Sequence, residues 1–463
     1  MTLTAQLVRF AAHLRRDALP AAIEHKLRLH LLDAIGCGWA ASGTALARQA
    51  HELARLAGGQ GECLVFGSPA GYSAAAAAFA NAFIINALDH DDGVEIDGKG
   101  LGHPGATLIA AAMAALDQHP GGVGEDDLIA ALAAGFEINN RLILALQPSA
   151  ERFSQAYGVG QHQAIGAAVV YGRARGFDED TLHRAVGFAA TLTSVPSLHK
   201  YNWQTRPIAA LKDGVAPAAQ AGVQAALMAQ LGLAGSREVF DGPQGYWRMV
   251  GSDRFASEHL LDGLGQDWFI RFGSFKRYPA CRWLATALEC TEALVQRSGW
   301  GAADIAHIEV QTFGRLAEDF MVYRPATATD AQFSLPYTVA AAALGLRPGA
   351  PWYAGATLTS PAVLALAAKV SVTVDPGFDE RFRGVGRQPG ARVILVNRAG
   401  ECLQQAQNTP QGSAARPLED AAVLHKARLN LNGQVPGPSG LIERLMGQPG
   451  SPAHYANAQA WVQ

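Results

Sequence analysis

The chain has 463 residues, of which 49% are hydrophobic and 17% charged, as is typical of a folded protein with a large core. A net charge of -3 gives the whole molecule no attraction to nucleic acid or to an anionic membrane, so neither is expected as a partner. The five cysteines have no C-x-x-C spacing, which argues against a disulfide framework or a zinc site and fits a reducing cytoplasm.

The N-terminal stretch MTLTAQLVRFAAHLRRDALP lacks a positive region followed by an apolar one, so no secretion signal is expected. The most apolar runs are rich in alanine and are interrupted by polar residues well short of about 18 apolar positions. These features predict buried helices rather than membrane spans, and a cytoplasmic protein.

Apolar residues in the first half recur at helical spacing. Pro20 stands where a helix can begin, because its missing N–H would be unpaired there anyway. Ile23, Leu27 and Leu31 then place an amphipathic helix that runs to about Ser42. The small side chains of this half predict close helix–helix approach in a tight bundle. Further helices are predicted over residues 45–57, 74–89, 104–117, 125–146, 163–175, 179–192 and 214–231.

The pattern changes after about residue 268. Residues 307–313 and 369–374 alternate apolar with polar side chains, as half-buried strands do. Residues 391–403 predict a hairpin that turns near Ala399-Gly400. Strands with hairpin connections, mixed with helices, predict a small α+β domain with an antiparallel sheet. Helices are expected between these strands, over residues 283–298, 334–345 and 359–368, and one or two more at the C-terminal end.

The densest group of ionisable residues is the run DHDD at positions 89–92, followed by a glycine-rich loop and by HPG at 103–105. A helix beginning near Ala106 would attract anions through its free N–H groups and its dipole. His103 could exchange a proton there near neutral pH. Helix caps and a solvated loop explain the same residues. Asp/His spacings of this kind can also hold a divalent cation, but no EF-hand pattern or H-E-x-x-H occurs, and no metal is expected.

Lysine is scarce, since only seven of the 37 basic side chains are lysines. Lys212 lies in Leu-Lys-Asp-Gly and Lys276 in Phe-Lys-Arg-Tyr-Pro-Ala-Cys, each ahead of a predicted helix. A lysine at a helix start could clamp a carboxylate, or act as a base if burial lowers its pKa. Tyr337, in Phe-Ser-Leu-Pro-Tyr, could donate to a substrate oxygen. A surface position for each lysine and a core position for the tyrosine are the alternatives.

Five motifs, in the same order along most of the chain, resemble those of the MmgE/PrpD family. They are LLDAIG at 31–36, NAF…ALDHDD…HPG within 81–105, QTR…LK within 204–212, FKRYPAC at 275–281 and FSLPY at 333–337. The resemblance implies a mainly α protein with a large all-helical domain, residues 1–267 and 405–463. A smaller α+β lid domain with an antiparallel sheet would span residues 268–404. The site would lie between the two domains, and the protein would form a homodimer.

Members of this family include 2-methylcitrate dehydratase, cis-aconitate decarboxylase and iminodisuccinate epimerase. They share chemistry at a carbon next to a carboxylate and need no organic cofactor or metal, so no cofactor is expected here. By analogy with the decarboxylase, the resemblance places the catalytic positions on Asp89, His103, Lys212, Lys276 and Tyr337. The further positions expected to contact substrate are Asp92, Tyr157, Arg277 and Cys281.

Several pocket positions depart from the family pattern. Asn86 stands where the family often has histidine, Gly93 where it has threonine or serine, and Tyr157 where a histidine of its "HPT" stretch falls. The segment from Asp92 to His103 is also longer than in the decarboxylase. The fold implied by the resemblance does not depend on these positions, whereas the identity of the substrate does.

The expected activity is that of a cofactor-independent hydro-lyase that acts on a polycarboxylate similar to 2-methylcitrate. Lys212 and Lys276 would hold carboxylates, and His103, oriented by Asp89, would move the proton at the adjacent carbon. Tyr337 would donate to the developing enolate or to the departing hydroxyl. An epimerase or decarboxylase of the same family, with an iminodisuccinate- or cis-aconitate-like substrate, is the first alternative. A non-catalytic homologue that binds a carboxylate ligand is the second.

Overall fold

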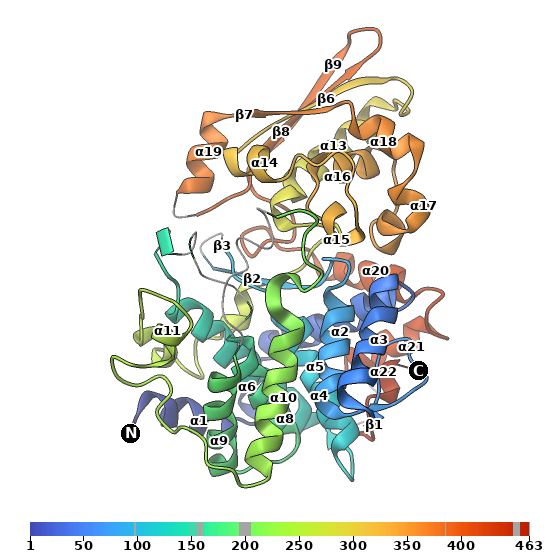
Figure 1. Ribbon diagram of the computed structural model, residues 1–463. Helices are drawn as coiled ribbons and strands as arrows, with labels where there is room; N and C mark the ends of the chain where they lie inside the picture. The colour runs from blue at the N-terminus through green and yellow to red at the C-terminus, as the bar shows by residue number, and fades with distance from the viewer. Residues whose placement is uncertain are drawn as a thin grey trace.

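The computed structural model describes residues 1–96, 99–149, 151–152, 155, 160, 162–193, 205–384, 386–447 and 454–462. The predicted class, mainly α with a smaller α+β part, is confirmed. A layer of packed helices carries the first half of the chain, and a four-stranded sheet with its own helices lies above it (Figure 1). The domain limits at residues 267 and 404 stay a prediction.

The long helices predicted for the first half are confirmed to within a few residues. Helix α10 (Val215–Gln230) runs through the middle of the layer and contacts helices on several sides. A side chain at Gly222 would place its Cβ 2.5 Å from the carbonyl oxygen of Ala164, so α8 and α10 approach too closely for anything larger. The other helices of this layer are α1 (Leu3–His13), α2 (Ala21–Ala41), α3 (Ala45–Gly58), α4 (Ala74–Asn86), α5 (Pro104–Gln118), α6 (Glu125–Ala145), α8 (Gln163–Ala174), α9 (Glu179–Leu192), α11 (Tyr246–Met249) and α12 (Glu258–Leu261).

One helix of the described residues, α6, is long and apolar enough to cross a membrane. It is instead packed inside the bundle, with 94% of its most apolar window buried. Its contacts with α8 and α5 make it part of the core.

The lid sheet has the strand order β7-β6-β8-β9, formed by β7 (Val370–Val374), β6 (Ile305–Thr312), β8 (Ala391–Asn397) and β9 (Cys402–Gln407). The expected purely antiparallel sheet is corrected in one place, because β6 and β7 pair in parallel. The chain between them passes through α14 (Gly314–Asp319), α15 (Ala328–Ala331), α16 (Leu335–Ala343), α17 (Gly355–Leu358) and α18 (Pro361–Ala367). A crossover of this length can return the chain to the end of the sheet where β6 began.

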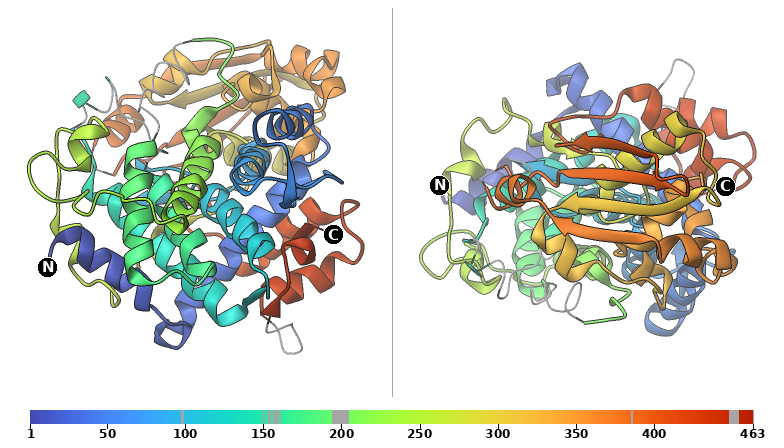
Figure 2. Two further views of the ribbon diagram at one scale, coloured as in Figure 1. Left: turned by 60° about the horizontal axis from the view of Figure 1, so that its bottom comes forward. Right: turned by 90° about the horizontal axis from the view of Figure 1, so that it is seen from above.

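Helices cover only one face of the lid sheet. Helix α13 (Ala285–Ser298) packs on β8 and β9, and α16 contacts β7, on the side that faces the helical layer. The opposite face is open in the view from above (Figure 2). The β8–β9 hairpin turns at Ala399-Gly400 as predicted. Gly400 adopts φ 84°, and the Asn397 side chain accepts hydrogen bonds from the backbone of Ala399 and Glu401.

After the sheet the chain returns to the helical layer. Helix α20 (Asp420–Leu431) packs along α2, and α21 (Pro438–Leu445) contacts both. The last helix, α22 (Gln459–Val462), follows strand β10 (His454–Tyr455), which pairs with β4 (Val123–Gly124). A helix or two at the C-terminal end was predicted, but α20 was not, because its buried positions include Lys426 and Asn430 and no apolar stripe stands out.

A small second sheet occupies the stretch that was expected to be a loop. Strand β2 (Gly93–Ile96) pairs antiparallel with β3 (Lys99–Gly100) on one side and with β5 (Gly273–Ser274) on the other. This pairing brings the residues that follow β5 against the acidic run that precedes β2. Segments nearly two hundred residues apart in sequence therefore meet between the two layers.

Candidate active site

Three helix ends meet beneath the lid. Helix α4 ends at Asn86, α5 begins after His103, and α10 begins after the turn Lys212–Gly214. The segment that follows β5 adds Lys276 from the lid side. Four of the five expected catalytic side chains, those of Asp89, His103, Lys212 and Lys276, are therefore brought together.

Asp89 is the centre of the charged cluster. Its Oδ1 lies 2.6 Å from Nζ of Lys212 and its Oδ2 lies 3.0 Å from Nζ of Lys276. The three side chains are almost completely buried. Burial would raise the pKa of Asp89, but the two ammonium groups outweigh it and lower that pKa. The backbone of Asp89 is left-handed, with φ 52°, a conformation that aspartate tolerates better than most residues.

The two lysines differ in how completely their N–H groups are used. Lys212 donates to Asp89, to Asn86 Oδ1 at 3.0 Å and to Asp213 Oδ2 at 3.1 Å, so all three donors have acceptors. Lys276 contacts only Asp89, through the carboxylate and through the backbone carbonyl at 3.0 Å. Among the described residues, one N–H of Lys276 is left for a ligand.

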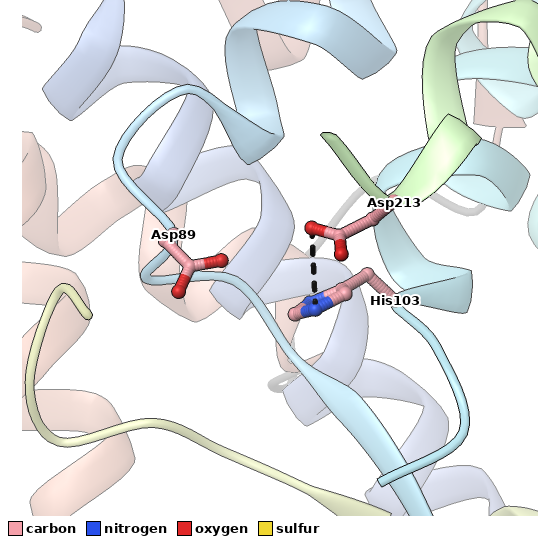
Figure 3. Close-up of side chains that lie close together, drawn as sticks. All are labelled: Asp89, His103 and Asp213. Carbon is pink, nitrogen blue, oxygen red and sulfur yellow. Dashed lines mark ion pairs between the residues drawn. The ribbon is translucent and has the colours of Figure 1, made fainter. Parts of the chain in front are cut away.

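His103 lies between two carboxylates. Its Nδ1 is 3.4 Å from Oδ2 of Asp91. Its Nε2 is 3.7 Å from Oδ2 of Asp213, the ion pair drawn as a dashed line in Figure 3. Burial and the Lys276 ammonium oppose a charged imidazole, but Asp91 and Asp213 outweigh them and raise the pKa of His103 above its ordinary value. The raised pKa favours the imidazolium form of the ring, which can donate a proton.

Asp92 supports the start of the helix that carries His103. Its two carboxylate oxygens accept from the backbone N–H of Gly105 at 3.0 and 3.1 Å, and His30 Nδ1 lies 2.7 Å from Oδ2. A Cβ at Gly105 would lie 2.7 Å from the same carboxylate, which explains the glycine of the HPG motif. Asp92 was expected to contact substrate. In the structure, the Asp92 carboxylate instead accepts the hydrogen bonds from the first turn of α5.

Tyr337 is fully buried on α16, and its hydroxyl donates to the backbone carbonyl of Trp352. Burial raises its pKa. Tyr353 stacks on Tyr337 with 6.4 Å between the ring centroids. The pKa of the Tyr353 phenol is raised mainly by burial and secondly by the negative charge of Asp89, which lies nearby. No hydrogen bond among the described residues joins Tyr337 to the Asp89 cluster.

Of the three other residues expected to contact substrate, Cys281 lies beside the cluster, Arg277 lies away from it and Tyr157 is not described. The pKa of the Cys281 thiol is raised to about 12, mainly by burial and secondly by the negative charge of Asp89. The thiol is therefore protonated beside the cluster. Arg277 is not in the cluster, because its guanidinium pairs with Glu292 and donates to Gln411. Tyr157 lies outside the described residues.

Asp91 and Asp213 were not among the expected site residues, and Asn86 was expected only as a pocket position that departs from the family pattern. All three complete the cluster. Asn86 Nδ2 donates to the Asp91 carboxylate at 3.1 Å while its oxygen accepts from Lys212. Asp213 and Gly214 are both left-handed, with φ 62° and 69°, and this turns the Asp213 carboxylate toward His103. The Lys-Asp-Gly sequence carried a signal for such a turn, since aspartate and glycine are the residues that tolerate it.

One nitrogen or oxygen atom from each of Asp89, His103 and Asp213 falls within 4.8 Å of the others, a spacing that a metal ion could use. The fit is poor, however, because the ammonium groups of Lys212 and Lys276 already lie against these oxygens and would repel a cation. The same ammonium groups, with the N-termini of α5 and α10, favour an anion.

The site is thus defined by a partly buried histidine between two carboxylates, beside an ammonium group with a donor to spare. Groups of this kind, at the boundary of the two layers, can bind an anion and exchange a proton with it. The chain belongs to the MmgE/PrpD family. The model of the MmgE/PrpD N-terminal domain matches residues 5–258, and that of the C-terminal domain matches residues 278–443.

Several relatives align with most of the chain. The cis-aconitate decarboxylase-like protein oryM of Aspergillus oryzae is 26% identical over 92% of this chain and 89% of its own length. A cis-aconitate decarboxylase of Aspergillus terreus is 24% identical over 95% and 91%, respectively. The cis-aconitate decarboxylase of Mus musculus is 23% identical over 90% and 84%.

Proposed function

We propose that the protein is a lyase that acts on a small polycarboxylate by proton transfer at a carbon next to a carboxylate. The observation that carries this proposal is the position of His103, held between Asp91 and Asp213 and next to the ammonium group of Lys276. A proton donor beside a carboxylate-binding cation is the pair of groups that such a reaction needs.

Lys276 is the group proposed to bind the substrate. Its remaining N–H can donate to a carboxylate oxygen, and the dipoles of α5 and α10 add positive potential at their N-termini nearby. Lys212 is proposed to act differently. Because its donors are all in use, it fixes Asp89 and Asp213 in place rather than binding substrate itself.

Decarboxylation of an unsaturated tricarboxylate is the reaction favoured by the relatives. In that reaction the bond between a carbon and its carboxylate breaks and carbon dioxide leaves. The electron pair passes into the remaining conjugated carboxylate, where Lys276 stabilises the charge, and His103 gives its proton to the carbon. An imidazolium is the required form at the start, in agreement with the raised pKa of His103.

Dehydration of a 2-methylcitrate-like acid is the second candidate, and the QTR…LK and FSLPY motifs favour it. In a dehydration, His103 would donate its proton to the departing hydroxyl, and a carboxylate such as Asp213 would accept the proton from carbon. Epimerisation needs the same proton acceptor but no leaving group. The three reactions therefore differ in products more than in the residues that they require.

The test is proton NMR in heavy water with cis-aconitate, 2-methylcitrate, citrate and iminodisuccinate as separate substrates. We expect turnover or deuterium exchange with at least one acid, and the product identifies the reaction. His103→Ala should lose at least about a hundredfold in rate, the lower end of what general acid catalysis contributes. Lys276→Met should lose both rate and substrate affinity, whereas Lys369→Met, at a lysine of the lid sheet, should behave as wild type.

Exchange that survives unchanged in both His103→Ala and Lys276→Met would overturn the assigned site. Binding of these acids without exchange of any carbon-bound proton would instead support a non-catalytic homologue.

A further inference from the structure

A cavity of about 340 Å³ adjoins the two segments, residues 89–92 and 276–277, that carry part of the candidate active site. One side is formed by lid residues, including Arg277 and Glu292, and the other by α20 with His90 and Lys426. Its volume is in the range of small-molecule sites. The cavity does not include His103, Lys212 or Lys276, so it is separate from the cluster described above.

Neighbouring residues of these two segments contribute to different sites, one to the active-site cluster and the next to the cavity. Asp89 and Asp91 contact the active-site cluster, whereas His90, between them, lines the cavity. Lys276 likewise contacts Asp89, whereas Arg277 lines the cavity. His90 and Arg277 are also joined directly, because His90 Nε2 donates to the Arg277 carbonyl at 3.1 Å. The cavity is thus built from the same two segments as the active site.

His90 presents an unused acceptor. The residue is 2% exposed, and its Nδ1 has no hydrogen-bond partner within the part of the chain that the structure describes. Because Nε2 must carry the proton that it donates to a carbonyl, Nδ1 carries a lone pair. Burial, followed by the charge of Lys426, lowers the pKa of His90 and keeps the ring neutral. This atom is itself covered by the protein, so a ligand in the cavity would reach it only by displacing the groups that cover it, and an O–H or N–H group there would then satisfy it.

The other walls add cations and an apolar surface. Lys426 uses two donors, toward Asp33 Oδ1 at 2.7 Å and toward the His90 carbonyl, so a third N–H is left among the described contacts. Arg277 lies across the cavity in its ion pair with Glu292. Ala422 and Leu429, seven residues apart on α20, contribute an apolar surface, and Leu418, which precedes the helix, adds to it.

We propose that this cavity binds a small monocarboxylic acid that carries an O–H or N–H donor on the carbon next to the carboxylate and a short apolar side chain. The carboxylate would lie between Lys426 and Arg277, the donor would bond His90 Nδ1, and the side chain would pack against the α20 face. Both 2-hydroxy acids and 2-amino acids have this chemistry. The proposal does not depend on the reaction proposed for the active site.

The experiment is isothermal titration calorimetry on the full chain with three probes of the same carbon skeleton. These are 2-hydroxy-4-methylpentanoate, leucine and 4-methylpentanoate, and the last lacks the donor. We expect at least one of the first two to bind about tenfold or more tightly than 4-methylpentanoate, since an unsatisfied buried acceptor is costly. Which of the two binds distinguishes a hydroxy acid from an amino acid.

Variants locate the binding. Ala422→Trp should fill the cavity and abolish binding, whereas Ala421→Trp, on the exposed side of α20, should leave it intact. His90→Phe should remove the preference for a donor, and Arg277→Met should weaken every carboxylate probe. His103→Ala should bind the probes like wild type.

Equal binding of all three probes, or the absence of binding by both donor-bearing acids, would overturn the proposal. It would also be overturned if His103→Ala lost the probe while Ala422→Trp kept it, because the probe would then occupy the active site. Loss of activity on polycarboxylates in the earlier test leaves these outcomes unaffected.

Discussion

Asp89 holds two buried ammonium groups, so its charge should matter for stability as well as for the site. Asp89→Asn keeps a residue that tolerates the left-handed backbone and removes only the charge. We expect it to lower the unfolding free energy by about 3 kcal/mol or more, because breaking a buried pair leaves charges uncompensated. The measurement is the thermal unfolding midpoint.

The matched control for Asp89→Asn is Asp420→Asn, since Asp420 pairs with His25 at the exposed surface. That change should have little effect, as surface ion pairs contribute little. If the two variants unfolded at the same temperature as wild type, the buried cluster would not have the electrostatic role assigned to it.

His103 should set the alkaline limit of activity. Its pKa is raised in the folded protein, so the imidazolium persists above the ordinary value of a free histidine and is lost as pH rises through the folded-state pKa. Activity that needs the imidazolium should fall over the same pH range. Asp213→Asn removes one of the two carboxylates that raise this pKa, and it should shift the alkaline limb of the kcat profile to lower pH.

The pH profile separates this role of Asp213 from a merely structural one. A variant that only loosened the site would lower kcat at every pH without moving the limb. Asp304→Asn, in a turn of the lid away from the cluster, serves as the control and should leave both the rate and the limb where they are.

At the residue scale, the sequence predicted which charged residues gather at the site better than it predicted what each of them contacts there. The positions of Asp89, His103, Lys212 and Lys276 were predicted and meet in space. Asp213 was not singled out, because an aspartate before a glycine usually serves a turn, and here it serves both a turn and His103. The difference between Lys212 and Lys276 was not predictable either, since it depends on acceptors supplied by Asn86 and by a backbone carbonyl.

The start of α5 is the element on which the site depends most. A Cβ at Gly105 would lie 2.7 Å from the Asp92 carboxylate, so Gly105→Ala should push the helix start away from Asp92 and displace His103. We expect a loss of about 1–3 kcal/mol of stability, as for other overpacked sites, together with a lower kcat. Unfolding midpoints and initial rates measure the two effects.

Gly43→Ala is the control for the helix start, because a Cβ at Gly43 meets nothing within 4 Å. Unchanged activity in Gly105→Ala would show that the contact between Asp92 and α5 does not position His103.

Among the elements, long periodic helices such as α2, α6 and α10 were predicted nearly to their ends, because apolar residues recur along them. Helix α20 was missed because Lys426 and Asn430 are buried in it. The β2–β3 pair and its pairing with β5 were also missed. These strands have two to four residues each, and their partner lies far away in sequence, so no local pattern marks them.

At the scale of the whole molecule, the active site lies where the helical layer meets the lid, and ligand binding should therefore stabilise both. A polycarboxylate substrate at a hundred times its Kd should add about 2.7 kcal/mol to the unfolding free energy. The check is a rise in the unfolding midpoint with added cis-aconitate or 2-methylcitrate. Lys276→Met should show a smaller rise, whereas Lys369→Met should match wild type, and an equal rise in all three proteins would place the ligand elsewhere.

The fold class, mainly α with a smaller α+β part, was predicted. The mixed sheet was not, because the parallel pairing of β6 and β7 depends on how the long crossover between them returns and not on the sequences of the strands. The homodimer and the cytoplasmic location stay predictions. A sedimentation velocity experiment across a range of protein concentrations would establish the number of chains in the particle.

The two segments that the cavity and the active site share suggest how this region can evolve. Along these segments, the side chains that contact the active-site cluster alternate with those that line the cavity. An inserted or deleted residue in the run from Asp89 to Asp92 would send acidic groups into the cavity and a histidine into the active site. This stretch should therefore keep its length, and engineered libraries should leave the number of its residues unchanged.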